Sequence, residues 1–164
     1  MKLLVYVATC LTLSGQSTLG PVTGHLSINP SKIRAGESVE VRVEAVNRGH
    51  EPIQVASGAP ETRMCGHFRV RIAGNGVTLQ APAPSEGPDI IGSCLYGGQN
   101  IAPGHKYTES FWIGRDGEFS QPGTYSIDVT YQLIYDNANT WPSPKSPGAR
   151  FHSQFKVIVE KAAK

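Results

Sequence analysis

A strict alternation of apolar and polar residues over residues 125–133 constrains this chain more than any other feature. The apolar members are Tyr125, Ile127, Val129, Tyr131 and Leu133, and the polar members between them are Ser126, Asp128, Thr130 and Gln132. Successive side chains of a strand point to opposite faces, so this pattern predicts a strand with one buried face and one wet face. An amphipathic helix would repeat every 3.6 residues, and no long stretch of the chain does so.

The same period of two recurs along the chain. It is clear over residues 39–45, 68–72 and 155–159, and shorter candidates are residues 25–28, 53–56, 77–79 and 107–113. The 18 glycines and 12 prolines cluster between these runs, and Asn75-Gly76 is typical of a tight hairpin turn. Seven or eight short strands with such turns predict an all-β, antiparallel two-sheet sandwich of the immunoglobulin-like type, in a single domain over residues 21–164. The predicted core consists of Val41, Val43, Phe68, Val70, Ile72, Phe111, Tyr125, Ile127, Val129, Phe155 and Val157.

Two segments interrupt the strand pattern and are predicted to be long loops. Residues 80–100 and residues 136–150 are rich in proline, glycine, serine or asparagine. Loops beyond about 12–15 residues are uncommon in compact domains unless they are functional or fastened. Both segments are therefore places to look for a site or a cross-link.

The N-terminus predicts export. Lys2 is followed by an apolar run over residues 3–13 and then by small residues such as Ser14, Gly15 and Gly20. This is the pattern of a secretory signal peptide over residues 1–20, with cleavage expected between residues 15 and 22. We therefore expect a secreted or periplasmic protein. An N-terminal core strand and a lipid-modified Cys10 are the alternatives that the sequence leaves open.

Cys65 and Cys94 are the cysteines that remain once Cys10 leaves with the signal peptide. Two cysteines in an exported chain favour a disulfide bond. This bond would close a loop of about 30 residues and stabilise the fold by roughly 3–4 kcal/mol. It would also fasten the long segment 80–100 to the sandwich.

A soft-metal site is the alternative for the same cysteines, because Met64 and His67 flank Cys65. Structural zinc prefers paired knuckles in which two cysteines stand close in sequence, and Cys65 has no such neighbour. A blue-copper site needs a different order of Cys, His and Met. We therefore predict a disulfide, with no metal and no cofactor.

The chain also lacks the motifs of common catalytic sites. It has no G-x-S-x-G nucleophile elbow, and His50-Glu51 is not followed by the second histidine of a zinc protease. Residues 136–140 resemble a calcium loop only faintly, with too few carboxylates. We therefore predict that the protein is not an enzyme.

The charge and hydropathy of the chain limit the classes of partner that it is expected to bind. Charged residues make up 17% of the chain, the formal net charge is +2, and there is no run of lysines and arginines. A nucleic-acid interface requires a strongly basic face, so none is predicted. The longest apolar run is shorter than the roughly 20 residues needed to cross a bilayer, so no stable membrane span is predicted.

Three motifs at the ends of predicted strands resemble those of a known family. Val46-Asn47-Arg48-Gly49 ends one strand, Pro103-Gly104 precedes a strand with Phe111-Trp112, and Pro122-Gly123-Thr124-Tyr125 opens a long strand. In this order, over residues 38–135, the chain resembles bacterial immunoglobulin-like domains and most of all the BsuPI-type proteinase-inhibitor domain. The resemblance implies an immunoglobulin-like sandwich and, as an alternative function, a proteinase inhibitor. That family is intracellular, the disulfide is not implied by it, and no inhibitory residue of it matches a position here.

The corner motif has a physical meaning of its own. Gly123 allows a tight bend, and Tyr125 can place its ring in the core while its hydroxyl returns to the backbone, as in a tyrosine corner.

The predicted function is a non-catalytic binding module that holds a protein or a glycan with loops at one end of the sandwich. The candidate binding residues are Trp141 and Pro142, with Tyr135 and Arg150 flanking the loop 136–150. Tryptophan is the residue type most enriched among the energetic anchors of interfaces, and prolines stiffen a loop before it binds. The opposing interpretation is that Trp141 folds back as a lid over the core.

Overall fold

The residues that the computed structural model describes are 20–58, 68–75, 77–80, 95–115, 117–140, 146 and 148–162. Within these ranges the chain forms ten strands and no helix. The strands are β1 (Val22–Asn29), β2 (Lys32–Arg34), β3 (Val39–Asn47), β4 (Ile53–Gly58), β5 (Phe68–Gly74), β6 (Val77–Gln80), β7 (Leu95–Ile101), β8 (Lys106–Ile113), β9 (Gly123–Asn137) and β10 (Gly148–Glu160). The predicted all-β class is confirmed, with more strands than the seven or eight expected.

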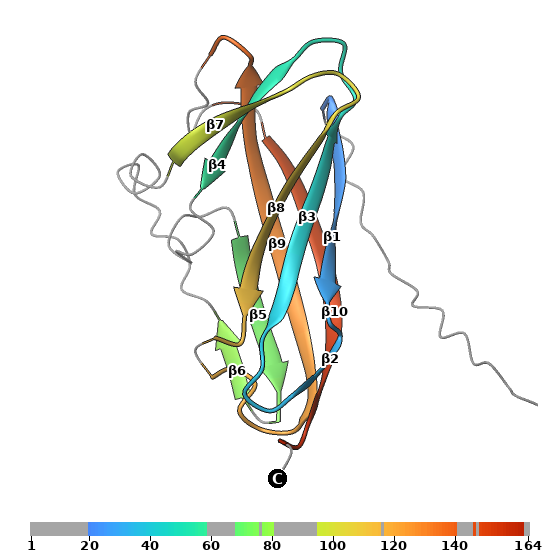
Figure 1. Ribbon diagram of the computed structural model, residues 1–164, viewed down its shortest axis with the longest axis vertical. Coiled ribbons are helices and arrows are strands. Elements are labelled where there is room, and N and C mark those ends of the chain that lie inside the picture. Colours follow the sequence, from blue (N-terminus) through green and yellow to red (C-terminus); the bar gives the residue numbers. More distant parts are fainter. Residues whose placement is uncertain are drawn as a thin grey trace, which may run out of the picture.

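The smaller of the two sheets has the strand order β1-β3-β8, and all its pairs are antiparallel. Figure 1 looks onto this sheet, with β3 and β8 in front of β9. Alternate residues of β3, from Val39 to Asn47, are buried against the other sheet. The residues between them, such as Glu40 and Arg42, form the outer face, as the period of two requires.

The larger sheet is organised around β9. Its strand β10 pairs with β9 on one side, and the three-residue β2 adds to β10 as a parallel strand. The other side of β9 is shared: residues 126–131 pair with β5, and residues 135–137 pair with β4. Strand β6 extends the sheet beyond β5, and β7 extends it beyond β4.

The core lies between the two sheets. Eight of the eleven predicted core side chains are buried: Val41, Val43, Ile72, Phe111, Tyr125, Ile127, Val129 and Val157. The other three, Phe68, Val70 and Phe155, are partly buried and pack against the core. Burial of this many aliphatic and aromatic side chains provides the main driving force for folding.

The tyrosine corner predicted at Tyr125 is confirmed. The Tyr125 ring is buried, and its hydroxyl donates a hydrogen bond to the carbonyl of Gln121 at 2.8 Å. Gly123 has a φ of +154°, and a Cβ there would lie 2.3 Å from the side chain of Asn75. The Asn75 amide in turn donates to the carbonyl of Pro122 at 2.5 Å. The corner and the β5–β6 turn are therefore packed together, and glycine is required at position 123.

The β5–β6 hairpin is also confirmed. Gly74 pairs with Val77, which leaves a two-residue connection, and Asn75 has a φ of +48°. This is the backbone conformation for which Asn-Gly is suited.

The predicted loop at residues 80–100 is wrong at both ends. Gln80 belongs to β6, and residues 95–101 form β7, which pairs with β4. The sequence of β7, LYGGQNI, does not alternate, because two glycines and then Gln99 and Asn100 stand between its apolar ends. Strand β2 was missed because three residues are too few to show a period.

Candidate functional site

Most of the predicted site residues lie outside the described residues. These are Cys65 and Cys94 with their neighbours Met64 and His67, the loop residues Trp141 and Pro142, and the expected signal peptide up to residue 19. The disulfide, the absence of a metal and the role of Trp141 therefore stay predictions.

Of the predicted binding residues, Tyr135 and Arg150 lie within the part of the chain that the structure describes. Tyr135 is only 5% exposed, and burial raises the pKa of its hydroxyl. Arg150 is exposed, but it lies within β10, paired with Gln132, and not in the loop. The period of two explains the difference, because Tyr135 continues the inward series of Tyr131 and Leu133 beyond the point where the prediction ended the strand.

Asn47 fixes two loops at one end of the sandwich. Its side chain is 1% exposed and donates to the carbonyls of Glu51 at 2.8 Å and Ile101 at 3.0 Å, while its Oδ1 accepts from the Gly49 amide at 2.9 Å. Its backbone also bonds to the β7–β8 loop, through Gly104 and His105. The β3–β4 and β7–β8 loops are thus held to one buried side chain.

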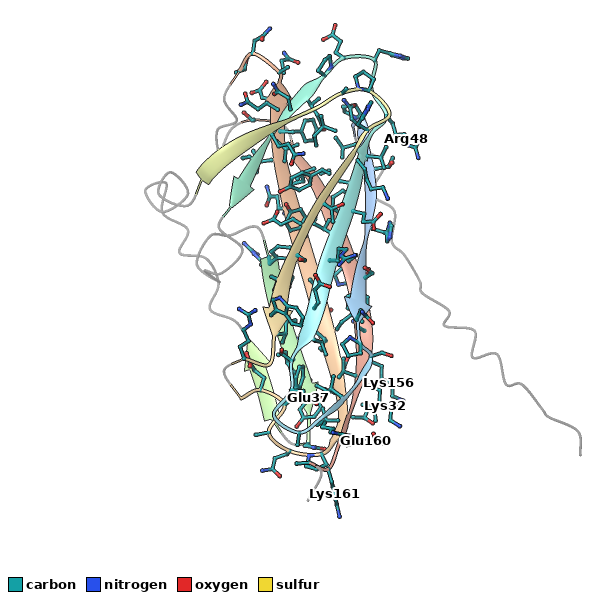
Figure 2. The ribbon with its side chains drawn as sticks, viewed as in Figure 1. Lys32, Glu37, Arg48, Lys156, Glu160 and Lys161 are labelled. Carbon is teal, nitrogen blue, oxygen red and sulfur yellow. The ribbon has the colours of Figure 1, made fainter. Side chains whose placement is uncertain are left out.

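The β9–β10 connection starts at this same end, because Asn137 pairs with Ile53 at the start of β4. Its base is fastened by Asp136, which accepts from the Ser146 hydroxyl at 2.7 Å and from the Asn137 amide at 2.8 Å. These hydrogen bonds hold the pKa of Asp136 below its ordinary value. We call this end, with its three loops, the Asn47 end; Figure 2 shows Arg48 there.

A carboxylate lies between the two sheets. Glu109 of β8 accepts hydrogen bonds on one oxygen from Tyr107 at 2.8 Å and from Tyr131 of β9 at 2.5 Å. Burial, together with the charge of Glu109, raises the pKa of both tyrosines. Phe68 packs on Tyr131 and on Phe111, with ring centroids 4.3 Å and 3.9 Å apart. Two phenols therefore stabilise the carboxylate, and the cluster joins the sheets.

The outer face of the small sheet carries paired charges. Arg42 lies 3.1 Å from Glu40, and Lys106 lies 2.9 Å from Glu44. The Ser110 hydroxyl, with Arg42 beside it, holds the pKa of Glu40 below its ordinary value, and Lys106 does the same for Glu44. This face is charge-balanced.

The small sheet also presents an aromatic ring to solvent. Trp112 is 42% exposed, and the guanidinium of Arg115 lies 5.5 Å from its ring centroid. The cation covers one face of the ring, an arrangement that stabilises both groups.

The outer face of the large sheet is basic. Arg69 and Arg71 of β5 lie across β9 from His152 and Gln154 of β10, with Thr130 and Asp128 between them. Arg150 and Lys156 continue the β10 row toward either end. We call Arg69, Arg71, Arg150, His152 and Lys156 the basic face; all five are exposed.

The one carboxylate registered within this face is already engaged. Asp128 lies 3.1 Å from His152 with one oxygen and accepts from Gln154 at 3.1 Å with the other. Among the described residues, no ion pair is formed by Arg69, Arg71, Arg150 or Lys156.

The basic face contains no consecutive lysines and arginines, so a search for such runs does not find it. A strand displays every second residue on one face, so the relevant patterns are Arg69-x-Arg71 and Arg150-x-His152-x-x-x-Lys156. The sequence of each strand shows the alternation. It does not show which strands lie side by side.

A metal site and a membrane-spanning helix can be checked within the described residues. No group of three or more His, Cys, Asp or Glu side chains there is placed to hold a metal ion. No helix in this part of the chain is long and apolar enough to cross a membrane.

No family model matches the chain, and no curated protein matches it. Among solved structures, it is similar to the C-terminal domain of wzt, with 12% identity and a TM-score of 0.46, over 92% of this chain and 80% of that one. For Spo0M, a sporulation control protein from Bacillus subtilis, the identity is 11% and the TM-score 0.41, over 87% and 50%. For a β-glucosidase from Listeria innocua they are 15% and 0.40, over 85% and 16%. This chain thus spans half or less of the last two proteins, and at these scores the likenesses add nothing about function.

Proposed function

We propose that the protein is a non-catalytic binding module that acts outside the cytoplasm and holds a protein or glycan partner at the Asn47 end. The observation that supports this proposal is the set of hydrogen bonds from Asn47 to the loops on either side of it. Loops that are fixed before binding lose less conformational entropy when the partner is bound. Binding loops on a rigid sandwich are also the usual arrangement in immunoglobulin-like folds.

The side chains offered at this end are polar. Arg48, His50, Glu51 and His105 are exposed on the two loops that Asn47 holds. They provide donors and acceptors for a polar partner, while the prolines Pro52 and Pro103 restrict the loop backbones. Export is proposed from the N-terminal pattern of residues 1–20 alone.

The test compares the two ends of the molecule. The purified full chain would be screened on a glycan array and against extracellular proteins from its source, and hits would be measured again with a triple variant, Arg48→Ala, His50→Ala and His105→Ala. The matched control is Lys32→Ala with Lys161→Ala at the opposite end, where Figure 2 shows both residues. We expect the triple variant to bind at least about tenfold more weakly, as for interface anchors, and the control to bind normally. Equal binding by the triple variant would contradict the proposal.

A secreted proteinase inhibitor is the second candidate function. It rests on the resemblance of the strand-end motifs to the BsuPI-type domain, of which the Pro122-Gly123-Thr124-Tyr125 corner is a part. The full chain would be assayed against a panel of secreted serine and metalloproteinases. Stoichiometric inhibition that the triple variant abolishes would favour this candidate over a plain binding module, and no inhibition at any concentration would remove it.

A further inference from the structure

We infer that the basic face is a binding site for an acidic polysaccharide, separate from the Asn47 end. The inference rests on four exposed cations, Arg69, Arg71, Arg150 and Lys156, that form no ion pair with any described residue. An ordinary protein surface intersperses both signs of charge, as the outer face of the small sheet does here. Unpaired cations on one face attract an anionic partner.

The dimensions of the face suit an extended polymer. Arg69 and Arg71 stand two residues apart on one strand, which places them about 7 Å from each other along β5. Arg150 and Lys156 are six residues apart on β10, a span of roughly 20 Å. Because β9 lies between β5 and β10, the two basic rows are separated by about 10 Å.

The residues between the two rows supply hydrogen-bonding groups. Ser126 and Thr130 of β9 and Gln154 of β10 point to the same face as the cations, by their register. Hydroxyls and amides can both donate and accept, and therefore match the hydroxyls of a sugar chain. Two rows of cations, with neutral hydroxyl and amide groups around the already engaged Asp128, are the chemistry that a polysaccharide with carboxylate or sulfate groups would recognise.

A nucleic acid fits this surface less well. Proteins that bind single strands stack the bases on aromatic side chains, and the basic face contains no phenylalanine, tyrosine or tryptophan. The surface is a sheet rather than a helix or ribbon of the width of a major groove. A nucleic acid is therefore kept as an outcome of the test.

The experiment measures the affinity of the purified full chain for polygalacturonate and for heparin, with dextran as the uncharged polysaccharide and duplex DNA as the other polyanion. We expect binding to both acidic polysaccharides that weakens as salt is raised, and none to dextran. Tighter binding to DNA than to either acidic polysaccharide, or equal binding to dextran, would overturn the inference.

Matched variants locate the site. Arg71→Gln with Lys156→Gln should weaken binding roughly tenfold or more. Arg42→Gln with Lys106→Gln removes the same charge from the small sheet and should change affinity less than about twofold. Equal losses in both double variants would show that only net charge matters and would overturn the inference.

A variant that binds the polysaccharide more tightly provides a control, because misfolding would weaken binding. Asp128→Asn removes the carboxylate from the middle of the face, and it should tighten binding by about twofold to fivefold. Unchanged or weaker binding by this variant would count against the site. The triple variant at the Asn47 end should bind the acidic polysaccharides normally, so this inference and the proposed function can fail independently.

Discussion

The two outer faces of the sandwich are built from the same alternating pattern and yet treat charge in opposite ways. On the small sheet, each of the cations Arg42 and Lys106 lies within 3.1 Å of a carboxylate. On the large sheet, Arg69, Arg71, Arg150 and Lys156 have no such neighbour among the described residues. Pairing between neighbouring side chains, within a strand or across strands, therefore decides whether the charges of an outer face are balanced, and composition alone does not.

The largest expected effect is on stability. It tests whether the two outer faces depend on one shared core. Val41 is fully buried, whereas the next residue, Arg42, points outward on the small sheet. Val41→Asp should unfold the domain, because an unpaired buried charge costs more than the roughly 5–15 kcal/mol of net stability. Arg42→Asp should leave a cooperative thermal transition. Circular dichroism of both variants checks this, and a folded Val41→Asp variant would contradict the expected loss of the core.

An intermediate effect concerns Glu109, the carboxylate that is stabilised by phenols rather than by a cation. Tyr131→Phe removes one of its two donors and should cost about 1.5–3 kcal/mol, the range for hydrogen bonds to charged groups. Urea unfolding measures this loss. A loss below about 0.5 kcal/mol would mean that the hydrogen bond contributes little.

The same tyrosine gives a dependence on pH. The pKa of Tyr131 is raised in the folded protein, above the ordinary value of 10.0 that it regains on unfolding. The contribution of the protonated Tyr131 hydroxyl to the free energy of unfolding is therefore complete below pH 10. It is lost as the pH rises above 10. The melting temperature of the wild-type protein should fall more steeply above pH 10 than that of Tyr131→Phe, and parallel curves would contradict the assignment.

The smallest effect compares one cation from each face. Arg42→Gln breaks the contact with Glu40 and should lower the melting temperature by about 1–3 °C, as expected for exposed ion pairs. Arg71→Gln breaks no ion pair with any described residue and reduces repulsion within the basic face, so the melting temperature should stay the same or rise slightly at low salt. Scanning calorimetry of both variants at low and high salt checks this contrast, and equal decreases would remove the distinction between the faces.

The sequence predicted those parts of the fold that depend on local patterns. The alternation over residues 125–133 identified most of β9, and Pro122-Gly123-Thr124-Tyr125 identified the corner whose hydroxyl bond is seen at 2.8 Å. Strand β7 has no alternation to detect in its sequence, LYGGQNI, and it is identified only by its pairing with β4. The clear alternation ends at Leu133, but β9 continues to Asn137 and buries Tyr135 as the next inward residue.

The candidate sites were harder to predict because they are assembled across strands. Asn47 could be identified as the end of a strand, but its partner Ile101 is 54 residues away in the sequence. Arg69 and His152 share a face only because both strands flank β9. Register between distant strands is set by the packing of the whole sandwich and is not encoded in any one segment.

One side of β9 pairs with both β4 and β5, and this has a consequence for how the chain can fold during synthesis. Strands β4 and β5 both pair with β9, although the paired residues are more than 50 positions apart in the sequence, and β10 completes the sheet only at residue 160. Contacts of such long sequence separation form slowly. A nascent chain that has passed residue 113 therefore still lacks the central strand of its larger sheet. The larger sheet cannot form until β9 and β10 have been synthesised, and until then β4 and β5 expose edges on which nascent chains can associate with one another.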